Sequence, residues 1–242
     1  MIDQPFIGMQ YLLDGFALIA TRGLRRFAII PLIINILLFI GFFLVLRHFM
    51  GEFNAWFATF LPHWLLWLSW VLWILFFVSY LVVLLYTFVT IANLVCAPFN
   101  SFLAEKVEYY LTGGVTESRT LMQNIKDVPR IIGRQLAILG YYLPRALGLL
   151  ILFFIPGVQL IAPVLLFLFH AWFIALTYMD YPTDNHRVPI REVRDWLEER
   201  RWISLGFGAS TLVATMIPVL NFFAIPAAVA GATKYWVEQR RK

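Results

Sequence analysis

The sequence predicts an all-α integral membrane protein with two long transmembrane helices, two partly inserted (re-entrant) helical hairpins and amphipathic surface helices. The composition is 61% hydrophobic and 14% charged, with a mean hydropathy of +0.78, whereas soluble domains carry about 25% charged residues. Residues 146–179 and 202–233 contain no Asp, Glu, Lys or Arg, and prolines interrupt each stretch. Such stretches favour membrane-inserted hairpins over a soluble core.

The first half of the chain contains an amphipathic segment followed by two predicted spans. Residues 4–20 mix apolar and polar positions, which predicts an interfacial helix. The first span, residues 27–46, has about the 20 residues needed to cross the hydrocarbon core. The second span, residues 64–97, begins with clustered tryptophans, which are typical of a membrane interface. Its helical pattern continues to about Leu111, where Thr112-Gly113-Gly114 predicts a stop.

The second half of the chain predicts hairpins at residues 146–179 and 202–233, with cytosolic helical segments at 98–145 and 180–201. Proline begins a helix well and fits its interior poorly, so Pro156–Pro163 and Pro218–Pro226 would form the buried tips. Legs of about 10–16 residues are generally too short to cross the membrane. Four kinked, complete spans are the alternative.

The basic residues predict the orientation of the chain. Of the 19 Lys and Arg residues, only Arg47 lies in the loop expected between the two spans, residues 47–63. Because basic residues concentrate on the cytoplasmic side, we expect both termini in the cytoplasm. The net charge of +5 therefore reflects topology rather than nucleic-acid binding. The whole chain, residues 1–242, is expected to form a single membrane transport domain.

The candidate binding site is the basic turn before the first span, formed by Gly23, Leu24, Arg25 and Arg26. A helix N-terminus presents unpaired backbone N–H groups and a positive dipole end. Two arginines beside it complete a cradle for an oxyanion, and glycine allows the backbone to approach closely. We interpret the turn as a site for a divalent tetrahedral anion. The alternative is that its arginines only anchor the topology or contact lipid headgroups.

Polar residues inside the apolar segments are candidates for an anion path or gate. Asn35, Asn93 and Asn100 could donate hydrogen bonds along a path, or join helices. Glu105 and Arg130 could form an ion pair that either gates the path or supports the fold. His170 lies in a predicted hairpin leg, where an ionisable group is either functional or held by hydrogen bonds.

The sequence favours neither a metal site nor an enzyme. Asp180, Asp184 and His186 are metal-ligand types at close spacing, but the intervening Pro182 and Asn185 indicate a solvated turn. The sequence has no H-E-x-x-H zinc motif, no phosphate-binding loop and no G-x-S-x-G nucleophile motif. We therefore expect no catalytic residues, metal or cofactor, and no ATPase.

Several motifs, in collinear order over roughly residues 10–237, resemble those of the bacterial CysZ sulfate transporters. They are Gly23-Leu24-Arg25-Arg26-Phe27, Pro31-Leu32 with Asn35, Ala97-Pro98-Phe99-Asn100 with Leu103-Ala104-Glu105, Lys126-Asp127-Val128-Pro129-Arg130, Tyr141-Tyr142-Leu143-Pro144-Arg145-Ala146, Phe154-Ile155-Pro156-Gly157, Asp180-Tyr181-Pro182 with Asp184-Asn185-His186, and Met216-Ile217-Pro218 through Asn221 to Gly231-Ala232-Thr233.

This resemblance implies sulfate uptake across the bacterial inner (cytoplasmic) membrane for sulfur assimilation and cysteine biosynthesis. It implies that sulfate contacts the Gly23–Arg26 turn, and that the protein forms homo-oligomers within membrane lipids. Since no nucleotide motif is present, we expect permeation without ATP hydrolysis. The alternative is a non-transporting scaffold that anchors a cytosolic partner through residues 101–145 and 180–201.

Overall fold

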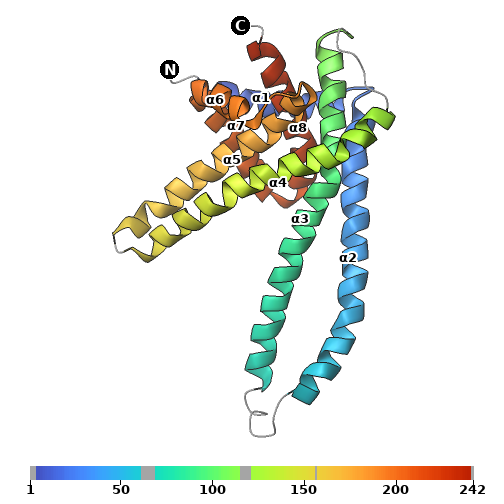
Figure 1. Cartoon of the computed structure of the whole chain (residues 1–242), viewed down its shortest axis with the longest axis vertical. Helices are drawn as coiled ribbons and strands as arrows, with labels where there is room; N and C mark the ends of the chain where they lie inside the picture. Colours follow the sequence, from blue (N-terminus) through green and yellow to red (C-terminus); the bar gives the residue numbers. More distant parts are fainter. Residues whose placement is uncertain (1–3, 61–68, 115–120, 156, 241–242) are drawn as a thin grey trace. The chain divides into compact units, whose positions relative to one another are not determined.

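The computed structural model describes residues 4–60, 69–114, 121–155 and 157–240, and within these ranges it contains helices and turns but no strand (Figure 1). This confirms the all-helical class. The chain divides into two compact units, one formed by Met1–Leu32 with Ala97–Lys242 and the other by Ile33–Cys96.

The helices are α1 (Gln4–Ala20), α2 (Arg25–Phe60), α3 (Ser69–Leu111), α4 (Leu121–Ile151), α5 (Ala162–Asn185), α6 (Ile190–Glu199), α7 (Arg201–Met216) and α8 (Pro218–Arg240), with short 3-10 turns η2 (Leu152–Phe154) and η3 (Val158–Leu160). Helix α1 confirms the helix predicted at residues 4–20. Helix α3 ends at Leu111, as predicted, and the following Gly113 and Gly114 have φ angles of 69° and 87°.

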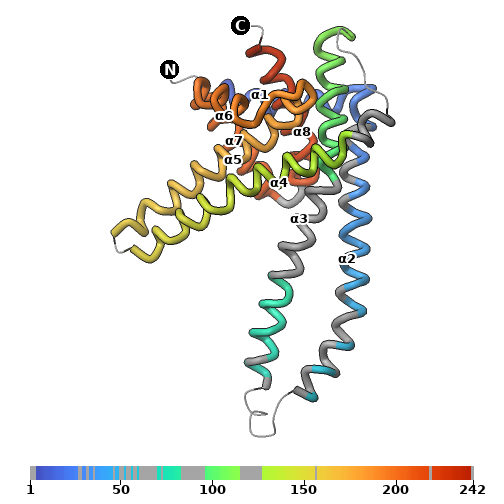
Figure 2. The backbone as a smooth tube through the Cα atoms, in the orientation of Figure 1, coloured from blue at the N-terminus to red at the C-terminus, as the bar shows by residue number. Residues whose placement is uncertain are grey.

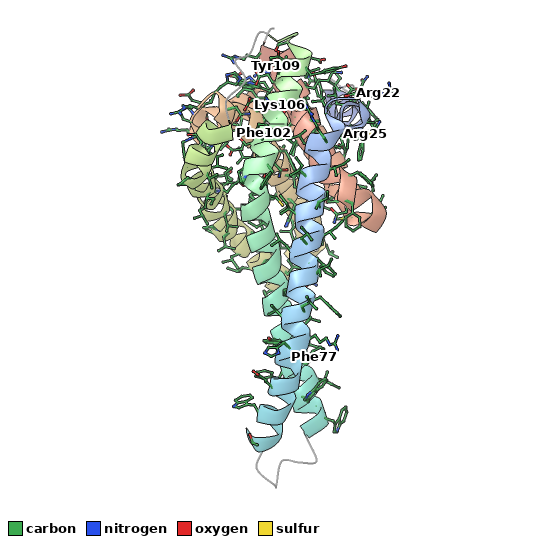
Figure 3. The ribbon with its side chains drawn as sticks, turned by 90° about the vertical axis from the view of Figure 1, so that its right-hand side faces the viewer. Arg22, Arg25, Phe77, Phe102, Lys106 and Tyr109 are labelled. Carbon is green, nitrogen blue, oxygen red and sulfur yellow. The ribbon has the colours of Figure 1, made fainter. Side chains whose placement is uncertain are left out.

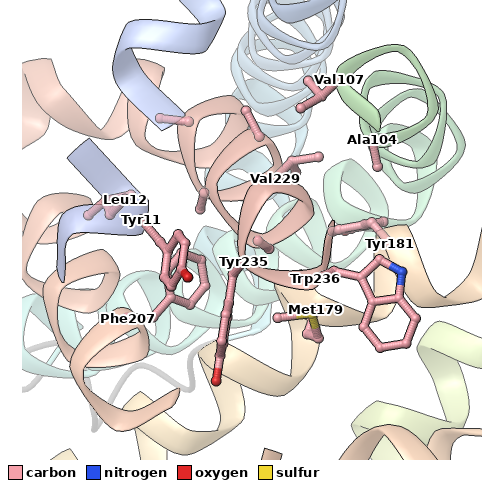
Figure 4. Close-up of a cluster of buried hydrophobic side chains, with 14 of the residues drawn as sticks. Tyr11, Leu12, Ala104, Val107, Met179, Tyr181, Phe207, Val229, Tyr235 and Trp236 are labelled. Atoms are coloured by element: carbon pink, nitrogen blue, oxygen red, sulfur yellow. The ribbon is translucent and has the colours of Figure 1, made fainter. Parts of the chain in front are cut away.

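The core of the larger unit forms where α1 and α5 pack against α7 and α8. Figure 4 shows Tyr11 of α1 stacked on Tyr235 of α8, with ring centroids 4.8 Å apart. Burial raises the pKa of Tyr235 to about 12, so its phenol stays neutral, and its oxygen lies 3.1 Å from Ser204 Oγ of α7. The N-terminal helix is therefore part of the core, beyond the interfacial role that its sequence predicts.

The first predicted hairpin consists of α4 and α5, joined through η2 and η3 (Figure 2). Pro163 lies in the first turn of α5, as predicted, whereas Pro156 lies outside the described residues. The expected short legs are wrong, because α4 has 31 residues and α5 has 24. Helix α4 passes without a break through the boundary expected at 145/146, so the amphipathic segment and the apolar leg form one helix.

The second predicted hairpin consists of α7 and α8, which meet at Ile217. Helix α8 begins at Pro218, as predicted, but Pro226 lies inside it, so a tip that extends to Pro226 is wrong. The neighbouring Ala227 and Ala228 are fully buried in the core. This packing offsets the helix hydrogen bond that the proline cannot make.

The charged surface helix predicted within residues 180–201 is α6. Its Arg194 and Glu198 form an i,i+4 ion pair, with Nε and Oε1 3.6 Å apart. Val193 and Leu197, on an adjoining face of the helix, are fully buried in the core.

The smaller unit consists of the parts of α2 and α3 within residues 33–96. The rings of Trp56 and Phe76 join the two helices, with centroids 6.3 Å apart. The loop expected at 47–63 is wrong up to residue 60, because α2 continues to Phe60; residues 61–63 lie outside the described ranges. The segment is mostly apolar and has no proline before Pro62, so nothing in it ends the helix early. Many large apolar side chains here are exposed, including Leu37, Phe39, Phe43, Leu44 and Leu75.

Candidate anion-binding site

The predicted basic turn joins α1 to α2 and is fixed by backbone hydrogen bonds. Thr21 closes α1, because its N and Oγ1 atoms donate to the Leu18 carbonyl oxygen at 3.1 and 2.7 Å. Gly23 has a φ of 104°, a conformation that favours glycine. The amide of Arg25 then donates to the Thr21 carbonyl oxygen at 3.2 Å, where α2 begins. Gly23–Arg26 is therefore an ordered turn at a helix N-terminus.

The turn directs one side chain into the core and its arginines outward. Leu24 is buried in the hydrophobic core, whereas Arg22, Arg25 and Arg26 are exposed. Figure 3 labels Arg22 and Arg25 beside the start of α2. Arg25 Nη2 donates to the Ala20 carbonyl oxygen at 3.4 Å, which holds the guanidinium near the end of α1. The Leu24 side chain therefore anchors the turn in the core. Of Leu24, only the backbone is placed to face a ligand.

The backbone of the turn is open to approach. Apart from Gly23 and its two chain neighbours, no atom of the described residues lies within 4 Å of the position that a Cβ on Gly23 would occupy. Backbone N–H groups at a helix N-terminus and exposed guanidinium groups are the donors that protein sites use for tetrahedral oxyanions. The turn can therefore present both kinds of donor to one anion.

Of the three candidate amides, the structure places the side chain of Asn100, while those of Asn35 and Asn93 lie outside the described side chains. Asn100 is 4% exposed, near the C-terminal end of α3. Its Nδ2 donates to the Tyr181 hydroxyl of α5 at 3.4 Å, and its Oδ1 is buried without a partner among the described residues. Asn100 therefore joins two helices and keeps one polar atom available.

Two arginines one turn apart on α4 hold the end of α5. Arg134 Nε lies 2.6 Å from Asp180 Oδ1, and Arg134 Nη1 lies 3.5 Å from Asp184 Oδ1. Arg130 pairs with Asp184 and also with Asp127, the latter at 3.3 Å. Asp180 and Asp184 are only 2% and 3% exposed, so their charges depend on these partners. Arg130 Nε and Arg134 Nη2 are buried and make no hydrogen bond within the described part of the chain.

These contacts correct two expectations. Arg130 pairs with Asp184 and Asp127 instead of Glu105, whose Oε1 lies 3.4 Å from Lys106 Nζ. The solvated turn expected around Asp180, Asp184 and His186 is also wrong, because α5 runs through Pro182 to Asn185 and buries both aspartates. Within the described residues, no group of three or more His, Cys, Asp or Glu side chains could hold a metal ion.

Polar contacts that the sequence analysis missed join α3 to the end of α5. His186 Nε2 lies 2.7 and 3.0 Å from the two carboxylate oxygens of Glu108. Ser101 Oγ donates to Asn185 Oδ1 at 2.9 Å, and Asn185 Nδ2 donates back to the Ser101 carbonyl oxygen at 3.0 Å. The paired residues are 78 and 84 positions apart, so no local pattern could have connected them.

His170 joins the two legs of the first hairpin. Its Nε2 lies 2.6 Å from the Tyr142 hydroxyl of α4, and its Nδ1 lies 2.9 Å from the Leu166 carbonyl oxygen. Both ring nitrogens therefore have a partner. Of the two alternatives for His170, a functional group or a residue held by hydrogen bonds, these contacts favour the second.

The fold defines an all-α protein with apolar helices of membrane-spanning length. Within the described residues, Asp127–Phe154 and Ala162–Asn185 are long and apolar enough to cross a bilayer. The model of the family described as "Sulfate transporter CysZ/Etoposide-induced protein 2.4" matches residues 11–226, and the chain belongs to this family. This confirms the resemblance found in the motifs. The family description names a transporter, and together with the apolar helices it indicates a membrane location.

Proposed function

We propose that this protein imports sulfate across the bacterial inner membrane, supplying sulfur assimilation and cysteine biosynthesis. The observation that carries the proposal is the family match, which spans residues 11–226 and includes the Gly23–Arg26 turn. Permeation proceeds without ATP hydrolysis, in keeping with a sequence that has no phosphate-binding loop motif.

Sulfate is first recruited by Gly23, Leu24, Arg25 and Arg26. Removing water from a dianion is costly unless several donors replace it. A guanidinium group offers paired N–H donors in one plane that match two oxyanion oxygens. The backbone N–H groups at the start of α2 add a partial positive charge and further donors. The exposed arginines and the open backbone at Gly23 support this assignment.

The path beyond the turn is lined or gated by Asn35, Asn93, Asn100, Glu105 and Arg130. Arg130 Nε, which makes no hydrogen bond within the described residues, and the buried Nδ2 of Asn100 are donors that could replace part of the hydration shell of sulfate. Glu105 is 5% exposed and negatively charged when ionised, so it opposes an anion unless a cation neutralises it. Its neighbour Lys106 can supply that cation, an arrangement suited to a gate.

The first hairpin enters the membrane only in part. Arg145 is an exposed residue of α4, and the uncharged residues 146–154 beyond it, in the rest of α4 and in η2, span about 14 Å at 1.5 Å per residue. That length is roughly half of a hydrocarbon core of about 30 Å. Complete crossing would place the charge of Arg145 deep in the lipid, which is costly.

The protein acts as a homo-oligomer with both termini in the cytoplasm. Partly inserted hairpins and two complete spans are too few to surround an aqueous path, so several copies would enclose it together. The cytoplasmic termini follow from the basic residues, which lie almost entirely outside residues 47–63.

The test is uptake of radiolabelled sulfate into liposomes that contain the purified protein, with protein-free liposomes as the control. We expect uptake that depends on the protein, follows the sulfate gradient and does not change when ATP is added. Uptake equal to that of protein-free liposomes would overturn the proposal and favour the scaffold that anchors a cytosolic partner.

A further inference from the structure

A cavity of about 320 Å³ lies beside the basic turn. Its walls come from the end of α1, the start of α2 and the first part of α8, and are formed by Phe16, Ile19, Ala20, Arg25, Ile29, Phe222, Phe223 and Pro226. Arg25 is the single charged residue among the side chains of this wall. The cavity therefore combines an apolar interior with one cation.

The cavity is open to the surroundings of the protein. Phe222 and Phe223 are 53% and 49% exposed, and Ile29 is 40% exposed. Exposed apolar walls of this kind mark a binding surface or a surface that faces lipid. A hydrated anion alone would gain little inside the cavity, because apolar walls cannot replace the water that the anion loses.

We propose that this cavity binds one acyl chain of an anionic phospholipid, with the headgroup phosphate on the guanidinium of Arg25. The apolar walls suit a hydrocarbon chain, which packs against aromatic and aliphatic side chains. Both kinds of phospholipid carry a phosphate, but the ammonium of a zwitterionic headgroup offsets its charge, so Arg25 favours the lipid with a net negative charge. The ligand class is therefore an amphiphile that carries a net negative charge at one end.

The order of residues along α2 matches the depth profile of such a lipid. Arg25 precedes the apolar run that begins at Phe27, so it stands at the headgroup level. Ile29 lies one helical turn further, about 6 Å deeper at 1.5 Å per residue, where the chain begins. The phosphate would thus contact the charged Arg25, and the acyl chain would contact the apolar Ile29.

The lipid site goes beyond sulfate transport and does not depend on it. Phosphate and sulfate are both tetrahedral oxyanions, so a headgroup on Arg25 would compete with sulfate for the same donor. The cavity distinguishes the two ligands, since only the lipid needs its apolar walls.

The test is native mass spectrometry of the full-length protein in detergent with added phosphatidylglycerol, and separately with phosphatidylcholine of identical acyl chains. We expect phosphatidylglycerol to be retained at least about tenfold more strongly. Arg25→Ala should remove this preference, and Ala20→Phe, which fills the cavity, should weaken retention about tenfold while Arg25 stays in place. Arg191→Ala and Ala137→Phe, changes at exposed positions outside the cavity wall, are the matched controls.

Three results would overturn the proposal. The first is equal retention of the two lipids, and the second is unchanged retention in a folded Ala20→Phe variant. The third is full competition by glycerol phosphate, which would assign the binding to the headgroup alone. If Ala20→Phe changes the number of copies in the complex without changing bound lipid, the cavity is an interface between copies instead.

Discussion

At the residue scale, glycines set how closely α1 approaches α8. A Cβ on Gly15 would lie 2.0 Å from the Ala227 carbonyl oxygen and 2.8 Å from the Gly231 amide nitrogen. A Cβ on Gly231 would lie 2.4 Å from the Tyr11 carbonyl oxygen. The backbones of α1 and α8 are therefore in direct contact, the packing that small residues allow between helices in membranes.

We predict that Gly15→Ala destabilises the protein by about 1–3 kcal/mol, because the added methyl group forces α1 and α8 apart. Thermal unfolding in detergent measures the effect. The control is Gly140→Ala on α4, where no described atom lies within 4 Å of the new Cβ. This variant should match the wild type or gain about 0.5–1 kcal/mol from its helix propensity. Equal stability of the two variants would show that α1 does not pack on α8 in this way.

The buried charges at the end of α5 make a second prediction. Asp180→Ala leaves the guanidinium of Arg134 buried with one partner fewer, so we expect a loss of about 3–5 kcal/mol in unfolding free energy. Asp195→Ala, at a side chain that is 59% exposed, is the control and should change stability by less than about 1 kcal/mol. Combining Asp180→Leu with Arg134→Met should recover much of the loss. If the double variant loses as much unfolding free energy as the two single variants together, Asp180 and Arg134 are not a coupled pair.

The residue scale also shows which part of the site could be predicted from the sequence. The Gly23–Arg26 turn was found because its residues are consecutive and stand before an apolar run. The partners of Arg134 and Glu108 lie 46 and 78 positions away, and only the packing of α3, α4 and α5 brings them together. Local pattern carries no information about such distant pairs.

At the scale of the elements, prolines account for two errors in the prediction, the hairpin tip at Pro226 and the solvated turn around Pro182. Pro163 and Pro218 begin helices, as expected from their chemistry. Other prolines lie inside helices, among them Pro98, Pro129, Pro144, Pro182 and Pro226. Proline inside a helix persists where neighbouring helices compensate for the lost hydrogen bond. The sequence identifies the prolines but not the tertiary packing that decides between a helix start and a helix interior.

The Asp14–Lys234 pair joins α1 to α8 and makes a pH-dependent prediction. The Asp14 carboxylate accepts a hydrogen bond from Lys234 Nζ at 2.7 Å and raises the pKa of that amine. A raised lysine pKa stabilises the fold below the unfolded value of about 10.4, and the gain disappears as pH rises through the folded pKa.

We therefore expect Asp14→Asn to lower the unfolding free energy by about 0.5–1 kcal/mol at pH 7–9. The difference from the wild type should vanish above the raised pKa of Lys234. Melting curves of both proteins between neutral and strongly alkaline pH provide the measurement. A difference that persists after the lysine has lost its proton would mean that the pair does not act through its charge.

The hairpins make a prediction about access from each side of the membrane. Cysteines at the positions of Gly157 and Asn221, in a Cys96→Ser background, should resist a membrane-impermeant thiol reagent added from outside. Glu52→Cys, in the segment expected outside, should react, and Arg191→Cys should react only from inside. Labelling of both tips from outside would show that the helices of both hairpins cross the membrane completely.

At the scale of the whole molecule, the chain combines a basic turn at the start of α2 with buried polar groups at the ends of α3 and α5. The turn supplies exposed donors, while Asn100 Nδ2 and Arg130 Nε are buried donors. The sequence predicted the helical class and the family because hydropathy and short motifs depend on consecutive residues. How several copies would enclose a path depends on surfaces that no local pattern describes.

The most direct test compares sulfate uptake into proteoliposomes by the wild type and by the Arg25→Ala, Arg26→Ala double variant. The matched control is Arg191→Ala with Arg201→Ala, which removes two exposed arginines from α6 and α7. Each protein must first show the same thermal unfolding and the same insertion as the wild type. We predict that uptake is lost in the first double variant and kept in the second. Wild-type uptake in a folded Arg25→Ala, Arg26→Ala protein would contradict the assignment of the turn as the sulfate site.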